Sequence, residues 1–128
     1  MLAKSIKGSS PQEIQSELRL SMADGFRPTL AVVFISVKQD RKAICKILSK
    51  EEVDVFGTTS SGEFIDGYQG EGSIVILLFD IPRDYYDILF EEICDWELRE
   101  VAHQVARRAT EKFANPSLIL CSTGLNVK

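Results

Sequence analysis

Four hydroxyl side chains lie between two glycines in the stretch GTTSSGEF, residues 57–64, and a single carboxylate follows them. Hydroxyl groups both donate and accept hydrogen bonds, and glycine lets a ligand approach the backbone closely. Three kinds of structure are compatible with this stretch: a plain turn, a loop that holds a nucleophile or a phosphate, and the rim of a small-ligand site.

A phosphate-binding loop does not fit these residues. The motif GxxxxGK[ST] places a lysine after its second glycine, where it contacts the phosphates. Gly57 and Gly62 have the required separation, but Glu63 stands in the lysine position and would repel phosphate. We therefore reject this motif.

A hydrolytic site is also disfavoured. The nucleophile motif GxSxG would need a glycine where Thr58 precedes Ser60. The one histidine, His103, lies on the polar side of a predicted helix, and the three cysteines have no CxxC spacing. We expect no catalytic residues, no metal site and no cofactor, and a hydrolase is the least favoured function.

The turn and the ligand rim both stay open for residues 57–63. Serine and threonine often bond their own backbone in turns. In parallel α/β units, however, ligands collect beyond the carboxyl ends of the strands, and this stretch follows the apolar segment VDVF. Glu63 is interpreted either as an exposed carboxylate at a strand start or as a partner for an amine or hydroxyl of a ligand.

Other predicted strands end in hydroxyls as well. Ser36 closes one apolar run, and Ser122 and Thr123 follow another. If these strands lie parallel and adjacent to VDVF, their hydroxyls converge at one edge of a sheet. The candidate ligand-binding residues are therefore Ser36, Thr58, Thr59, Ser60, Ser61, Gly62, Glu63, Ser122 and Thr123.

The first half of the chain predicts a βαβ unit. Ser10, Pro11 and Glu13 mark a helix start, with Gly25 at its end. The run 29–37 is apolar on both faces, which predicts a central strand covered on both sides. Asp40 caps a second predicted helix, and a short strand at 53–57 follows, parallel to the first.

The second half predicts an antiparallel meander and a last helix. GEFIDG and SIVILLFDI are expected as strands around the glycine-rich turn YQGEG, and residues 85–93 as a third strand, with a short helix as the alternative. Asp95 caps a helix that ends at Asn115, and SLILCS, 117–122, is a final strand. We predict one domain, 1–128: an α/β sandwich of two or three layers, with a mixed sheet and about three helices.

Composition restricts the partners and the compartment. The net charge of −4 and a longest basic run of two arginines argue against nucleic-acid binding. No apolar run reaches the roughly 18 residues of a membrane span, and the N-terminus has no signal-peptide pattern. An odd number of cysteines argues against a disulfide framework. We expect a cytoplasmic protein that contacts neither nucleic acid nor membrane.

The order of these motifs resembles the FIST N-terminal domain, named for F-box and intracellular signal transduction. The resemblance extends from about Leu30 to Leu125. The family signature after the second strand is close to G-C-S-[ST]-A-G-E-[IF]. The matching positions are Gly57, Ser60, Gly62, Glu63 and Phe64, and the departures are Thr58, Thr59 and Ser61. The segment LILCSTGLN is similar to a later family strand that ends in D-G-[LI], with Thr123 in place of the Asp.

The resemblance implies a non-enzymatic sensory domain that binds small ligands, amino acids or similar metabolites among them, and signals to a protein partner. The chain is similar to the first half of the family domain only. This implies an open sheet edge, and with it either a homo-oligomer or a missing second half. The alternative function is a structural or interaction domain that self-associates or recruits a partner through that edge.

Overall fold

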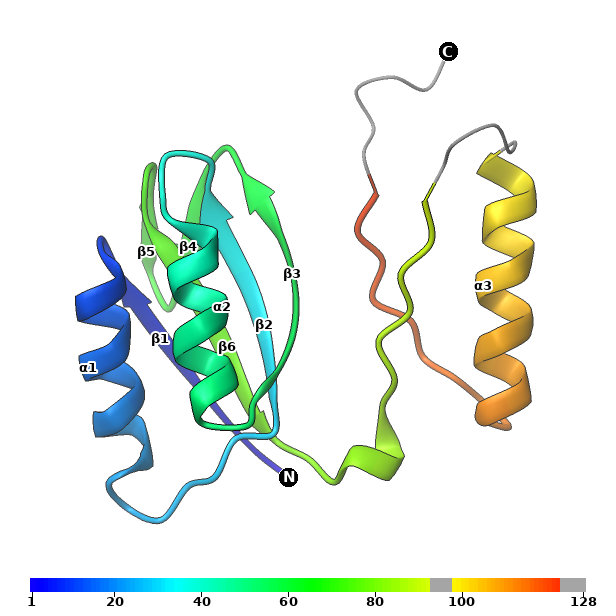
Figure 1. Ribbon diagram of the computed structural model, residues 1–128, viewed down its shortest axis with the longest axis horizontal. Coiled ribbons are helices and arrows are strands. Elements are labelled where there is room, and N and C mark those ends of the chain that lie inside the picture. Colours follow the sequence, from blue (N-terminus) through cyan, green and yellow to red (C-terminus); the bar gives the residue numbers. More distant parts are fainter. Residues whose placement is uncertain (93–97, 123–128) are drawn as a thin grey trace. The chain divides into compact units, whose positions relative to one another are not determined.

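The computed structural model describes residues 1–92 and 98–122 (Figure 1). The chain divides into two compact units, Met1–Tyr86 and Asp87–Lys128. The first unit contains the sheet, a hairpin, two α-helices and a short 3-10 helix, and the described residues of the second unit contain one α-helix. Among the helices of the described residues, none is both long enough and apolar enough to span a bilayer.

The sheet of the first unit is mixed. Its strand order is β1 (Leu2–Gly8), β6 (Ile74–Asp80), β2 (Leu30–Ser36) and β3 (Asp54–Ser60). Strands β2 and β3 are parallel, whereas β6 is antiparallel to both β1 and β2. The predicted α/β class, with a parallel βαβ start and antiparallel strands after it, is confirmed.

Two helices cover one face of this sheet, α1 (Pro11–Met22) and α2 (Arg41–Lys50) (Figure 1). Their predicted caps are confirmed. The Ser10 hydroxyl accepts a hydrogen bond from the Glu13 amide at 3.3 Å, and the Glu13 carboxylate accepts one from the Ser9 amide at 2.7 Å. Asp40 accepts from the Ala43 amide at 3.0 Å. Each cap satisfies backbone donors that the first turn of a helix leaves unpaired.

The core lies between these helices and the sheet. Side chains of a strand alternate between its two faces, so every second residue of β2 and β6 faces the helices. The core side chains are Ile6, Ile14, Leu18, Phe26, Ala31, Val33, Ile35, Ile44, Leu48, Val53, Ile74, Ile76 and Leu78. On the opposite face, Phe34 is 40% exposed and Leu77 is 38% exposed. The prediction that the strand at 29–37 is covered on both sides is therefore wrong at Phe34, because both helices pack on the same face.

Strand β1 was not predicted. It is an edge strand with two lysines, and charged side chains are typical of sheet edges. The Lys4 ammonium donates to the Ser21 carbonyl at 2.7 Å and forms an ion pair with Asp24 at 2.6 Å. These contacts attach the edge strand to the C-terminal end of α1 and to the residues that follow it.

Strand β3 is longer than predicted and continues through Gly57 to Ser60. Gly57 pairs in register with Val33 of β2. A Cβ atom at position 57 would lie 2.2 Å from the Val33 carbonyl oxygen, far inside contact distance. The backbone of β3 can therefore follow β2 at this point only because residue 57 is glycine.

The antiparallel part differs in detail from the prediction. β4 (Glu63–Ile65) and β5 (Tyr68–Gly70) pair with each other as a separate hairpin. The predicted turn YQGEG thus contributes a strand at 68–70. β6 then returns between β1 and β2, instead of extending a consecutive meander.

Among its described residues, the second unit contains α3 (Leu98–Lys112), and residues 87–92 and 113–122 have no helix or strand. A single turn of 3-10 helix, η1 (Arg83–Tyr85), precedes residues 86–92, which form neither the predicted strand nor the alternative helix. Ion pairs join α3 to this segment, Arg108 with Glu91 and Lys112 with Asp87. Ile93 and the predicted cap Asp95 lie outside the described residues.

The predicted strand at 117–122 is also wrong, since these residues form no strand. An extended apolar segment becomes a strand only where a neighbouring strand satisfies its backbone groups, and no described strand pairs with this one. In α3, Ala109 is buried, while Leu98 is 44% exposed. The helix ends at Lys112, three residues before Asn115.

We expect Gly57→Ala to lower the free energy of unfolding by about 1–3 kcal/mol, because the added methyl group overlaps the Val33 carbonyl and forces β3 away from β2. The matched control is Gly62→Ala, whose Cβ would lie 3.7 Å from its nearest neighbour, and we expect a change within about 0.5 kcal/mol. Urea unfolding followed by circular dichroism measures both. Equal stabilities of the two variants would contradict the constraint.

Candidate functional site

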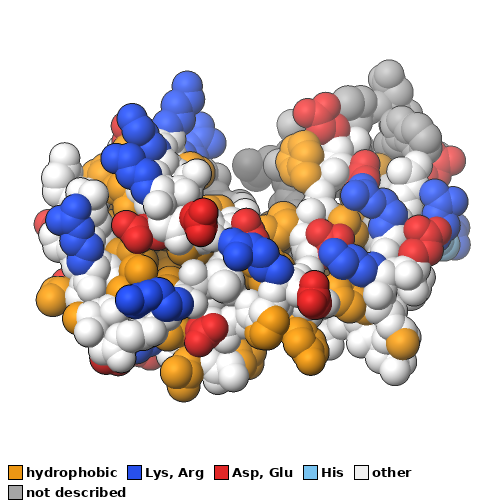
Figure 2. Space-filling model, turned by 60° about the horizontal axis from the view of Figure 1, so that its bottom comes forward, with side chains coloured by type: hydrophobic (Ala, Val, Ile, Leu, Met, Phe, Trp, Pro, Cys, Tyr) orange, Lys and Arg blue, Asp and Glu red, His pale blue; other side chains and the backbone are white. Residues whose placement is uncertain are grey.

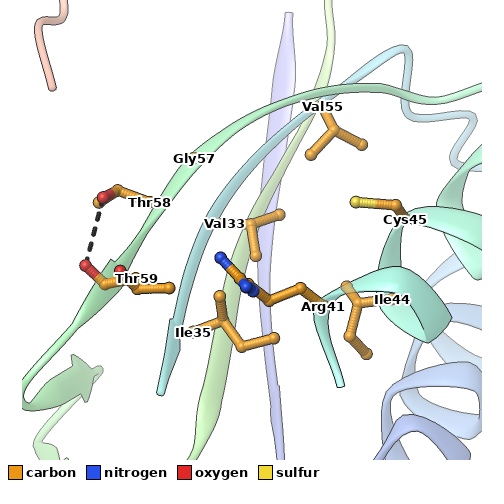
Figure 3. A pocket seen from close by; sticks show the side chains of 9 residues that line it. All are labelled: Val33, Ile35, Arg41, Ile44, Cys45, Val55, Gly57, Thr58 and Thr59. Atoms are coloured by element: carbon orange, nitrogen blue, oxygen red, sulfur yellow. Dashed lines mark hydrogen bonds between the residues drawn. The ribbon is translucent and has the colours of Figure 1, made fainter. Parts of the chain in front are cut away.

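A pocket of about 370 Å³ lies between helix α2 and strands β2 and β3 (Figure 3). It opens to solvent on the helix-covered side of the sheet. Its lining residues are Val33, Ile35, Arg41, Ile44, Cys45, Val55, Gly57, Thr58 and Thr59. All nine belong to the first unit.

The floor and one wall of the pocket are apolar. Val33 and Ile35 project from β2, Val55 from β3, and Ile44 from the inner face of α2 (Figure 3). Gly57 adds no side chain at the centre of this surface, opposite Val33. The same missing Cβ that allows the strands to approach therefore also leaves the pocket unfilled.

Polar groups occupy the rim. Arg41, the first residue of α2, extends its guanidinium over β2 in the direction of β3 (Figure 3). Cys45 lies one turn further along α2 and carries a free, exposed thiol. The Thr58 hydroxyl donates to the Thr59 carbonyl oxygen at 3.2 Å. Successive strand residues point to opposite faces, so Thr59 projects into the pocket and Thr58 away from it (Figure 3).

A second polar cluster ties together the ends of four strands. Glu63 is only 1% exposed. Its carboxylate accepts hydrogen bonds from the Ser60 hydroxyl at 2.6 Å, the Ser73 amide at 3.0 Å and the Ser73 hydroxyl at 3.1 Å. The Ser36 amide donates to the Ser73 carbonyl at 3.0 Å. Glu63 thus connects the end of β3 to the start of β6, next to the end of β2.

The protonation of Glu63 follows from these contacts. Burial by itself raises the pKa of the carboxyl group, but the donors at Ser60 and Ser73 outweigh it and hold the pKa below the ordinary glutamate value of 4.5. Glu63 is therefore a buried, ionised carboxylate at neutral pH. Its interpretation as an exposed carboxylate is wrong, because the chain's own donors surround it.

The predicted site residues fall into separate groups. Thr58 and Thr59 line the pocket, whereas Ser36, Ser60 and Glu63 meet in the buried cluster. Ser61 and Gly62 are exposed between β3 and β4. Ser122 is exposed in the second unit, and Thr123 lies outside the described residues. Ligand binding by these residues stays a prediction.

Sequence reasoning missed Arg41 and Cys45. They lie four residues apart on α2, and so on the same side of the helix, beside the inward-facing Ile44. Their spacing is visible in the sequence, but the rule that ligands collect beyond strand ends does not point to the first turn of the helix between the strands. The pocket lies over the face of β2 and β3 and not beyond their ends.

We expect Glu63→Gln to destabilise the chain by about 1–3 kcal/mol at neutral pH, because the amide group brings a donor to a site that already holds the Ser73 amide donor. The pKa of Glu63 is lowered on folding, so its contribution is complete above the unfolded-state value of about 4.5 and is lost as the pH falls through the folded-state value. The difference between wild type and variant should therefore shrink on acidification.

The matched control is Glu71→Gln, since Glu71 is exposed in the adjacent turn. We expect its stability to follow the wild type at every pH. Thermal or urea unfolding from pH 7 down to pH 3 measures all three proteins. A difference between Glu63→Gln and wild type that stays constant over this range would contradict the ionised state.

The chain was compared with curated proteins, solved structures and family models. Neither curated proteins nor solved structures gave a match. A family model, FIST N domain, matches residues 29–128, which include the strands and the helix that form the pocket as well as the Glu63 cluster. This match covers most of the chain and confirms the resemblance seen from Leu30 onward. The chain belongs to the FIST N domain family, a family of sensory domains in signal transduction.

Proposed function

We propose that this chain is a non-enzymatic sensory domain that binds a small metabolite in the pocket between α2, β2 and β3. The pocket itself carries the proposal. Its volume of about 370 Å³ lies in the range of roughly 300–1,000 Å³ that is common for small-molecule sites. An apolar floor with a few polar groups at the rim is the usual composition of such sites.

The surface charge of the protein favours a small molecule over a nucleic acid as the binding partner. Figure 2 shows acidic side chains interspersed with lysines and arginines on the described surface of each unit. The net charge of −4 points the same way. The free, exposed thiols of Cys45 and Cys121 suit a reducing compartment, and we propose the cytoplasm.

Transmission to a signalling partner would start at β3. This strand forms both a wall of the pocket and one edge of the sheet. The free side of an edge strand offers backbone groups with which a partner strand can pair. A ligand that contacts Thr59 would therefore act directly on the element that a partner recognises.

We expect a thermal-shift screen with amino acids and small carboxylates to identify stabilising ligands. At a ligand concentration of about 100 times Kd, binding adds about 2.7 kcal/mol to the stability of the folded state. Cys45→Phe should abolish the stabilisation by filling the pocket. Lys46→Phe is the matched control, because Lys46 is exposed on α2 and does not line the pocket. A folded wild type that no ligand stabilises would contradict the sensory function.

A second candidate function is an interaction domain that self-associates. The observation that favours it is the segment Leu118–Leu120, whose side chains are 50%, 66% and 73% exposed. Three consecutive exposed apolar residues are typical of a segment that pairs with another chain.

If this second candidate holds, the mass measured by light scattering should rise with protein concentration. Ile119→Lys should restore a monomer, because the charge disfavours burial of the segment. Ser117→Lys adds the same charge to a neighbouring exposed position and should leave the association unchanged. A wild type that stays monomeric throughout would exclude this function.

A further inference from the structure

We propose that the pocket selects a small monocarboxylate with an apolar chain, and that it discriminates against the zwitterionic amino acid of the same skeleton. This inference rests on the proposed function, in which the pocket holds the ligand. It goes further by assigning the charge and the polarity of that ligand from the lining residues.

Arg41 supplies the positive charge. Within the described part of the chain its guanidinium takes part in no hydrogen bond and no ion pair, unlike Arg83 and Arg108, which pair with acids. The guanidinium lies over β2 and faces the pocket (Figure 3). Its planar fork of donors matches a carboxylate in two parallel hydrogen bonds.

No acid faces Arg41 across the pocket. None of the nine lining residues carries a carboxylate. The preceding residue, Asp40, uses one carboxylate oxygen to accept the Ala43 amide and cap α2. An α-ammonium group on the ligand would therefore lie next to the Arg41 guanidinium with no acid of the lining to offset the repulsion between the two positive charges. The pocket is suited to one negative charge and to no positive charge.

The rest of the ligand meets apolar surface. Val33, Ile35 and Val55 present branched aliphatic side chains from the strands, and Ile44 faces them from α2 (Figure 3). A branched or short aliphatic chain buries its surface there, while its carboxylate stays at the open rim next to Arg41. The Thr59 hydroxyl lines the same pocket and can donate a further hydrogen bond.

Cys45 provides a direct readout. Its thiol lines the pocket and is exposed, so a bound ligand should protect it from alkylation by iodoacetamide. Cys121 is exposed in the second unit and serves as the internal control. Timed alkylation of the full chain, followed by digestion and peptide mass spectrometry, measures the two sites separately.

The experiment compares three probes with one carbon skeleton: 4-methylpentanoate, its amide 4-methylpentanamide, and leucine. We expect 4-methylpentanoate to slow alkylation of Cys45 and not of Cys121. The amide lacks the negative charge and leucine adds an ammonium group, so each should need at least about tenfold higher concentration for the same protection. Arg41→Gln should weaken protection by the acid about tenfold or more.

Arg19→Gln is the matched control for loss of a positive charge. Arg19 is exposed on α1 and does not line the pocket, so this variant should bind the acid like the wild type. Circular dichroism confirms that both variants are folded. Equal loss in both variants would mean that overall charge attracts the acid and would overturn the role of Arg41.

Two further outcomes separate this inference from the proposed function. Protection by leucine or the amide that equals protection by the acid would overturn the carboxylate selectivity and leave the pocket as a ligand site. Protection by none of the probes also overturns the inference. The broader thermal-shift screen then decides the proposed function. A different ligand would still support that function if it stabilises the wild type and if Cys45→Phe abolishes this stabilisation.

Discussion

The close parallel approach of β3 to β2 at Gly57 is the constraint on which the rest of the first unit depends. The pairing of Gly57 with Val33 fixes the register of the two strands. That register sets which side chains face α2 and which face the opposite side. Because glycine adds no side chain at this point, the strands close together and an open pocket remains beneath α2. The close strand pairing and the open pocket therefore both depend on the absence of a side chain at Gly57.

The elements that were predicted correctly are those whose signals are local. Ser10 and Asp40 cap their helices with side chains three residues from the amides they satisfy, so the sequence alone identifies them. The apolar run of β2 and the parallel βαβ unit follow from composition and from the right-handed crossover rule. The order of the motifs and the signature around Gly57 and Glu63 gave the resemblance that the family match confirms.

The errors occur where a structure depends on distant partners. β1 becomes a strand because β6 pairs with it some seventy residues later, and no local pattern shows that pairing. The apolar segments 86–92 and 117–122 resemble strands, yet they form none because no described strand pairs with them. Glutamate is usually a surface residue, but Glu63 is buried because Ser60 and Ser73 form hydrogen bonds with its carboxylate. Arg41 was missed because its importance comes from the strands that it faces.

The alternation of side chains along the end of β3 has a structural consequence. Thr59 faces α2, whereas its neighbours Thr58 and Ser60 face the other side of the sheet. Ser60 in turn donates to the buried Glu63 carboxylate. One peptide group therefore separates Thr59, on the pocket side of the sheet, from Ser60, whose hydroxyl is bonded to Glu63 on the other side. The pocket and the buried Glu63 carboxylate are thus neighbours along β3 although they lie on opposite faces of the sheet.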